Sequence, residues 1–233
     1  MALKVGIICA GDSELEPFLN YTQNCHVTEK AMLKFYEGEI NNISVVALYS
    51  GVCKVNAAIA AQILIDSYHV NTIISAGTAG GMEKTIKIFD TVISTQLAYH
   101  DVADDILVEF HPWLPSIYFN ADEKLLAAAK KIVQNQAVNH PVIFGKMVTG
   151  ESFIDKNMRE IINKKYAPLS VDMESASIAH VCYVNNIPFI SIRTFTDTAS
   201  HSGVENFEQN CDKASIISKD IVLAVLEELK NDL

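Results

Sequence analysis

The chain has 233 residues, 49% of them hydrophobic, and a formal net charge of -10 at pH 7. This length and apolar content suit one α/β domain with a sizeable core, so we expect residues 1–233 to form a single domain. The acidic balance argues against nucleic-acid binding, which needs clustered cations, and the arginines are limited to Arg159 and Arg193.

In the first half of the chain, short β-branched segments alternate with helical patterns, which is typical of an α/β fold. Ser13 followed by Glu16 forms a capping-box pattern and predicts the start of a short helix. Apolar periodicity predicts a second helix from Lys54 to His69. The strands predicted in this half cover residues 4–9, 33–39, 43–49, 72–76 and 91–97.

The second half begins with a long predicted loop from His100 to Tyr118, which contains two prolines. Beyond it, helices are predicted over residues 121–134, 157–165 and 174–183, and strands over 142–149 and 188–195. An aliphatic stripe at four-residue spacing, running from Ile217 to Leu229, predicts a C-terminal helix with one buried face.

Cysteine usage and the first residues indicate a cytoplasmic protein. The five cysteines form no C-x-x-C pair and show no metal-ligand spacing with the histidines, so we interpret them as reduced thiols and expect no metal. The N-terminal residues lack the basic region and cleavage site of a signal peptide. No apolar stretch is long enough to span a membrane, and we expect no membrane partner.

Polar residues and glycines gather where the predicted strands end. Because α/β folds place their sites at the carboxyl ends of strands, these segments are the candidate site. The segments are residues 10–14, 50–51, 77–81, 150–153, 172–174 and 196–197.

Several of these segments, taken in chain order, resemble the sequence blocks of one known family. They read GIICA at 6–10 followed by Glu14, SGVCKVNAA at 50–58, AGTAGG at 76–81, YHD at 99–101, TGESFI at 149–154, VDMESA at 171–176 and RTFTD at 193–197. The family is that of the 5'-methylthioadenosine/S-adenosylhomocysteine nucleosidases, in the purine nucleoside phosphorylase and uridine phosphorylase superfamily.

The resemblance implies a three-layer α/β/α sandwich with a central twisted mixed sheet, usually assembled as a homodimer. It also implies a small-molecule adenine thionucleoside as partner and no cofactor. The implied reaction is hydrolysis of 5'-methylthioadenosine or S-adenosylhomocysteine to adenine and a thioribose, with 5'-deoxyadenosine as a further substrate and methionine salvage as one setting.

Asp197 is the residue that the resemblance makes the general acid. It would protonate adenine N7 as the N-glycosidic bond breaks, and burial would raise its pKa enough to hold that proton. A structural alternative is an Asx-turn residue in Thr196-Asp197-Thr198. The motif around Asp197 favours the catalytic interpretation, and Thr196 beside it would bind substrate.

Glu174 would hold the ribose hydroxyls and stabilise the cationic transition state, with Met173 packed on the sugar face. Alternatively, Glu174 is a first-turn acid favoured by the helix dipole. Asp172 stands where the family has Glu, and its role stays open between substrate binding and an N-cap.

By the same resemblance, Glu14 would orient the attacking water, although it also fits a first-turn acid beside a Ser13 cap. Arg193 would orient the acids by pairing with Glu14 or Glu174, or would serve as an ordinary structural ion pair. Ser50 is a further supporting residue.

The remaining candidates shape the pocket. Residues 77–80 are predicted to form a tight turn whose backbone approaches the ligand. Phe153 would stack on adenine, and Phe207 would border the 5' pocket. We interpret His100 and His180 as structural. The substrate-binding set is completed by Ala10, Thr78, Ala79, Gly80 and Ile154.

Two alternatives compete with hydrolysis. Phosphorylases of this superfamily carry an arginine where Ser75 lies and another near the first loop, which is acidic here. Arg159 is predicted to lie on a helix away from the motif blocks, so water is the favoured nucleophile. The other alternative is a nucleoside-binding protein with a decayed site. The loop after Asp101 departs most from the family, in a region that helps to build the dimer interface and the 5' pocket.

Overall fold

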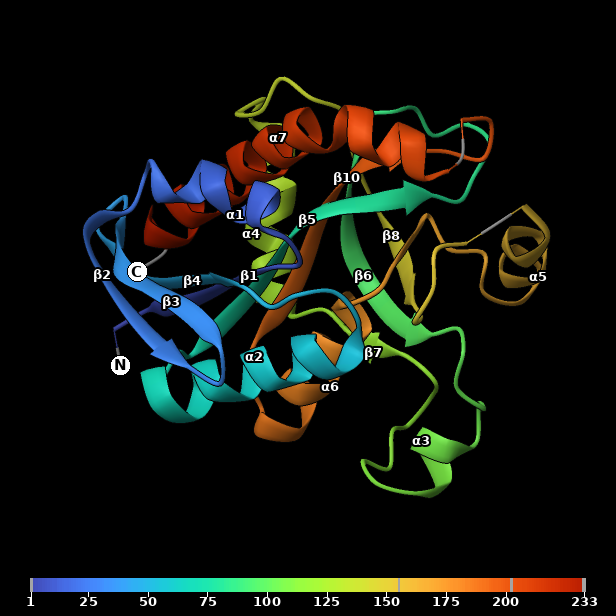
Figure 1. The fold of residues 1–233 in the computed structure, drawn as a ribbon, viewed down its shortest axis with the longest axis horizontal. Helices are drawn as coiled ribbons and strands as arrows, with labels where there is room; N and C mark the ends of the chain where they lie inside the picture. Colours follow the sequence, from blue (N-terminus) through green and yellow to red (C-terminus); the bar gives the residue numbers. More distant parts are fainter. Residues whose placement is uncertain (1, 155, 202, 232–233) are drawn as a thin grey trace.

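A mixed β-sheet forms the middle layer of the protein, and helices cover both of its faces (Figure 1). The computed structural model describes residues 2–154, 156–201 and 203–231. The strands are β1 (Lys4–Cys9), β2 (Gln23–Lys30), β3 (Leu33–Ile40), β4 (Ile43–Tyr49), β5 (Thr72–Gly81), β6 (Thr91–Tyr99), β7 (Phe119–Asn120), β8 (Val142–Thr149), β9 (Ser170–Asp172) and β10 (Phe189–Asp197). The helices are α1 (Asp12–Leu19), α2 (Lys54–Tyr68), α3 (Ile106–Glu109), α4 (Glu123–Gln134), α5 (Lys156–Tyr166), α6 (Ser175–Asn185) and α7 (Val204–Asn231). The predicted α/β/α sandwich is confirmed.

The strand order explains how distant segments reach one place. Neighbouring strands follow the order β10-β6-β8-β9-β5-β1-β4-β3-β2, and β7 pairs with β6. Since β10 also pairs with β5, one end of the sheet closes into a circuit of five strands. Gly80 of β5 therefore lies beside Asp197 of β10 on one side and Val171 of β9 on the other.

The tight turn predicted at residues 77–80 is wrong, and the strands β2, β7 and β9 were not predicted. Residues 77–80 do not form a tight turn, because β10 pairs along the segment, β9 pairs with Gly80 and Gly81, and β5 continues through Gly81. The strand β2 was missed, because it pairs along one edge with β3 and most of its side chains are exposed. Its sequence consequently shows no apolar alternation.

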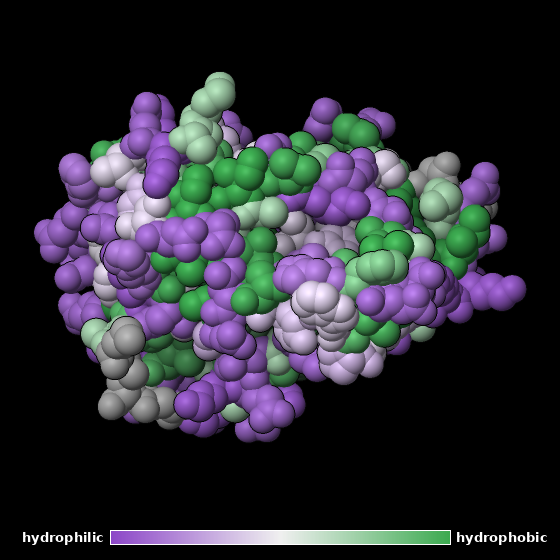
Figure 2. All heavy atoms as spheres, turned by 90° about the horizontal axis from the view of Figure 1, so that it is seen from below, coloured by the Kyte–Doolittle hydropathy of each residue, from purple (hydrophilic) through white to green (hydrophobic). Residues whose placement is uncertain are grey.

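The helices α2 and α6 pack together on one face of the sheet, with α3 beyond them in the 100–118 segment (Figure 1). This side carries exposed aliphatic and aromatic groups on α2 and around α3, including Val55, Ile59, Phe110 and Trp113. Figure 2, seen from below, shows hydrophobic areas between hydrophilic ones on this side of the molecule. Among the described helices, none has both the length and the apolarity that a membrane span needs.

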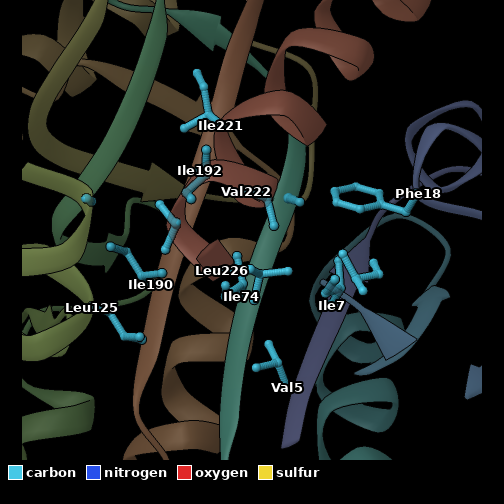
Figure 3. Packing of buried hydrophobic residues seen from close by; sticks show 14 of the residues in the cluster. Val5, Ile7, Phe18, Ile74, Leu125, Ile190, Ile192, Ile221, Val222 and Leu226 are labelled. Carbon is cyan, nitrogen blue, oxygen red and sulfur yellow. The ribbon is translucent and has the colours of Figure 1, made fainter. Parts of the chain in front are cut away.

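The larger core lies on the opposite face, under α1, α4 and α7. Ile74 of β5 and Ile192 of β10 meet Val222 and Leu226 of α7 there (Figure 3). Complete burial of an aliphatic side chain contributes roughly 1.5–3 kcal/mol. The core thus holds the central strands, and their site-bearing ends, in fixed positions.

Ile221 of α7 lies in this core and is fully buried, and we predict that Ile221→Ala lowers the free energy of unfolding by about 2–5 kcal/mol. The matched control is Ile216→Ala on the same helix, where the side chain is 48% exposed and the expected change is within about 0.5 kcal/mol. Urea denaturation followed by circular dichroism measures both. Equal losses at the two positions would contradict the assigned packing face.

Candidate active site

A pocket of about 340 Å³ opens at the carboxyl ends of β1, β5, β9 and β10. Its walls bring together every predicted site residue except Ser50. The predicted residues that line it are Ala10, Glu14, Thr78, Ala79, Gly80, Phe153, Ile154, Asp172, Met173, Glu174, Arg193, Thr196, Asp197 and Phe207. Segments more than 180 residues apart in the chain thus form one site, since Ala10 and Asp197 share its wall.

Ser50 supports the pocket from outside. Its hydroxyl donates to the carbonyl oxygens of Cys9 at 3.2 Å and Gly51 at 2.7 Å. These bonds tie the end of β1 to the segment that follows β4.

Glu14 is held at the start of α1 by four hydrogen bonds. Its Oε2 accepts from the backbone N–H groups of Ala10 at 2.7 Å and Gly11 at 3.2 Å. Its Oε1 accepts from the N–H of Thr78 at 2.7 Å and the hydroxyl of Thr78 at 2.8 Å. The predicted capping box of Ser13 and Glu16 is therefore wrong: Gly11 is the N-cap, and Glu14 is the third helical residue that bonds back to it.

Gly77 allows this approach between α1 and β5. Its φ is +148°, and a Cβ at this position would collide with the Glu14 carboxylate. Any side chain would therefore displace the carboxylate from Thr78.

Arg193 is buried in β10 and lies among three carboxylates. Its guanidinium nitrogens are 3.8 Å from Glu14 Oε1, 3.5 Å from Asp172 Oδ2 and 3.7 Å from Glu174 Oε2. It also donates to Ser75 Oγ at 2.9 Å. The predicted pairing with Glu14 or Glu174 is thus present with both, and Asp172 joins them.

Asp172 holds the start of α6. Its Oδ1 accepts from the Thr149 hydroxyl at 2.6 Å and from the N–H groups of Glu174 at 3.3 Å and Ser175 at 3.1 Å. The N-cap of α6 is Glu174, so the N-cap alternative for Asp172 is wrong; Asp172 instead accepts from the N-cap and the first helical residue, while its Oδ2 faces Arg193.

The carboxyl group of Glu174 is buried and has a raised pKa. Its Oε1 accepts from the N–H of Cys53 at 3.0 Å, and the residue is 4% exposed. Burial raises the pKa of Glu174 to about 7, with Arg193 opposing and Asp172 reinforcing the shift. Glu174 can therefore change charge near neutral pH.

Asp197 lies apart from this cluster, at the end of β10. Burial raises the pKa of its carboxyl group, while the Arg159 guanidinium opposes the shift. The Thr196 hydroxyl donates to Oδ1 at 3.3 Å, and Arg159 Nη2 lies 3.4 Å from Oδ2.

The placement of Arg159 corrects the sequence-based prediction. Arg159 was predicted to lie on a helix away from the motif blocks, but α5 folds against the end of β5 and directs Arg159 into the pocket wall. The residue lies outside the blocks, so motif reasoning gave no signal for it.

Other lining residues were given no individual role by the sequence analysis. Gly11, Ser13 and Ser152 lie within the candidate segments 10–14 and 150–153, whereas Val52 and Val171 directly adjoin candidate segments. Cys211 was a further omission, one turn beyond Phe207 on α7.

Two aromatic rings flank the pocket. Phe153 and Phe207 meet edge to face, with ring centroids 6.1 Å apart. Phe153 remains 47% exposed, so its ring is available to a planar ligand. Outside the pocket, the Tyr99 hydroxyl lies 3.3 Å from His180 Nδ1, as suits a structural histidine.

Comparison with known proteins places this pocket in a family. Residues 4–227 match the model of the phosphorylase superfamily. The 5'-methylthioadenosine/S-adenosylhomocysteine nucleosidase of Exiguobacterium sp. is 37% identical, over 98% of this chain and 99% of that protein.

Solved structures of a nucleosidase and of a futalosine hydrolase share the fold of this chain. The Colwellia psychrerythraea nucleosidase in complex with adenine has a TM-score of 0.88 and 31% identity, covering 98% of this chain and 96% of that one. The futalosine hydrolase of Helicobacter pylori has a TM-score of 0.88 and 26% identity, covering 98% and 99% of the two chains.

The raised pKa of Glu174 predicts a pH-dependent stability. The folded chain keeps this proton up to about pH 7, whereas the unfolded chain releases it near the ordinary value of 4.5. Unfolding therefore releases a proton between these values, and the contribution of Glu174 to the free energy of unfolding falls as pH rises through this window.

Replacing Glu174 with Gln removes this dependence. We expect the free energy of unfolding of E174Q minus that of the original chain to rise from pH 5 to pH 7.5, because only the original chain loses stability over this range. Urea denaturation across this range measures the difference, and Glu205→Gln on the exposed start of α7 is the control. A difference that stays constant with pH would contradict the raised pKa.

Proposed function

The chain belongs to the phosphorylase superfamily and, within it, to the 5'-methylthioadenosine/S-adenosylhomocysteine nucleosidases, and we propose that it hydrolyses the N-glycosidic bond of these two adenine thionucleosides. One observation carries the proposal. The pocket separates Asp197, paired with Arg159, from the cluster of Glu14, Asp172 and Glu174 around Arg193. Glycoside cleavage needs an acid at the leaving group and negative charge near the sugar.

Asp197 serves the leaving base. As the C1'–N9 bond breaks, its electron pair passes into the purine, and Asp197 donates a proton to N7. Burial raises the pKa of Asp197, which favours the protonated carboxyl group that this step needs. Phe153 stacks on the purine, with Ile154 and Thr196 beside it.

The carboxylate cluster serves the ribose and the water. Positive charge develops on the sugar, and Glu174 stabilises it while holding the hydroxyl groups, with Met173 against the sugar face. Glu14 accepts a proton from the water that adds to C1'. The overall change is nucleoside plus water to adenine plus thioribose, and solvent returns the proton from Glu14 to Asp197.

The pocket charges disfavour phosphate as the nucleophile. Among the described residues that line it, the cationic groups are Arg159 and Arg193, and both face carboxylates. An incoming phosphate at the Glu14 end would meet three acids around one arginine, so repulsion excludes it. Ser75, where phosphorylases of the superfamily carry an arginine, instead accepts a hydrogen bond from Arg193.

We also propose that the protein is a homodimer whose interface includes α2. Val55 and Ile59 project from this helix with 67% and 43% of their surface exposed. Val52, just before α2, is 56% exposed and also lines the pocket. A second copy seated on α2 would cover this apolar surface and narrow the mouth of the site.

Adenine release from 5'-methylthioadenosine in phosphate-free buffer tests the reaction. We expect turnover by the original chain and a loss of about 10²–10⁴-fold in Asp197→Asn, which cannot donate the proton. Asp212→Asn, an exposed site on α7, is the control and keeps full activity. Nucleoside binding by the original chain without turnover would instead identify a binding protein.

Sedimentation velocity tests the dimer. We expect the original chain to sediment as a dimer and Val55→Asp to shift it toward monomer, because a buried unpaired charge destabilises an apolar interface. The control is Met32→Asp, since Met32 is fully exposed in the turn between β2 and β3 and lies outside the proposed interface. A monomeric original chain, or equal effects of both substitutions, would contradict the assignment.

A further inference from the structure

Arg159 is a buried cation at the base end of the pocket. Its Nη1 donates to the carbonyl oxygen of Gly81, and its Nη2 lies 3.4 Å from Asp197 Oδ2. The residue is 5% exposed. A second contact fixes the same helix, because the Asn163 side chain donates to the carbonyl oxygen of Met82 at 3.0 Å.

Each carboxylate of the pocket named above lies within ion-pair distance of one of the two arginines. Glu14, Asp172 and Glu174 lie within ion-pair distance of Arg193, whereas Asp197 lies within that distance of Arg159. A guanidinium stays protonated throughout the range in which carboxylates titrate. Asp197 therefore always faces a positive charge, whichever state its own carboxyl group is in.

We propose that Arg159 is a positioning residue for the reaction, which holds Asp197 at the base end of the pocket and stabilises the carboxylate that remains after the proton has passed to the base. This inference rests on the proposed function. It adds a residue outside the motif blocks to the chemistry of the site.

The physical reason lies in the charge that proton transfer creates. When Asp197 gives its proton to N7, a carboxylate appears in a position that is 3% exposed. An unpaired buried carboxylate is strongly unfavourable, and a neighbouring guanidinium offsets this cost. Arg159 consequently makes Asp197 a stronger acid, while reducing the fraction of molecules that hold the proton at high pH.

The pH dependence of kcat/KM for adenine release tests the role. In the uncharged variants Arg159→Met and Arg159→Gln, Asp197 keeps its proton to higher pH. The alkaline limb of the profile, where kcat/KM falls with rising pH, should therefore move to a pH about one unit higher. The plateau rate should fall about tenfold or more, because the acid is weaker and less well placed. Arg159→Lys retains the charge and should keep the limb near its original position.

Asn163→Ala is the control for a purely structural role of α5. It removes the bond to Met82 but keeps the guanidinium, so the limb should stay in place. An alkaline limb that does not move in either uncharged variant, with circular dichroism showing folded protein, would overturn the inference. Absence of adenine release from the original chain would instead overturn the proposed function.

Discussion

The site depends on the burial of Arg193 among three carboxylates. A guanidinium that is 1% exposed must be paired, and pairing it with Glu14, Asp172 and Glu174 gathers acids from the start of α1, the end of β9 and the start of α6. Burial raises the pKa of Glu174 to about 7, and the negative charge of Asp172 and Glu14 reinforces the shift against the opposing effect of Arg193. The cluster is thus suited to a ligand on which positive charge develops.

The pocket has two differently charged ends, one with Asp197 and Arg159 and the other with the acids around Arg193. The closure of β5, β10, β6, β8 and β9 into a circuit places Asp197 beside Gly80, with Arg159 as its charged neighbour. In the proposed reaction, Asp197 acts at the base and the carboxylate cluster acts at the sugar, on opposite sides of one bond. The proposed hydrolysis follows from this separation.

Much of this arrangement could be predicted from the sequence, because strand ends and motif blocks mark the residues that line the pocket. Arg159 could not be predicted as a site residue, because its contact with Asp197 depends on how α5 packs against β5. Local sequence patterns do not encode this packing. The turn prediction at residues 77–80 failed for a similar reason: glycines suggest a turn, but pairing with β10 along the segment, and with β9 at Gly80, holds it extended. The start of α1 was misplaced because Gly11 has no capping side chain, and Glu14 supplies the capping bond from within the helix.

Reaction in ¹⁸O-labelled water, with phosphate also present, distinguishes hydrolysis from phosphorolysis. We expect the thioribose product to carry one ¹⁸O at C1, because water positioned by Glu14 is the nucleophile, and to form at the same rate whether or not phosphate is added. A sugar 1-phosphate without the label would instead make the protein a phosphorylase.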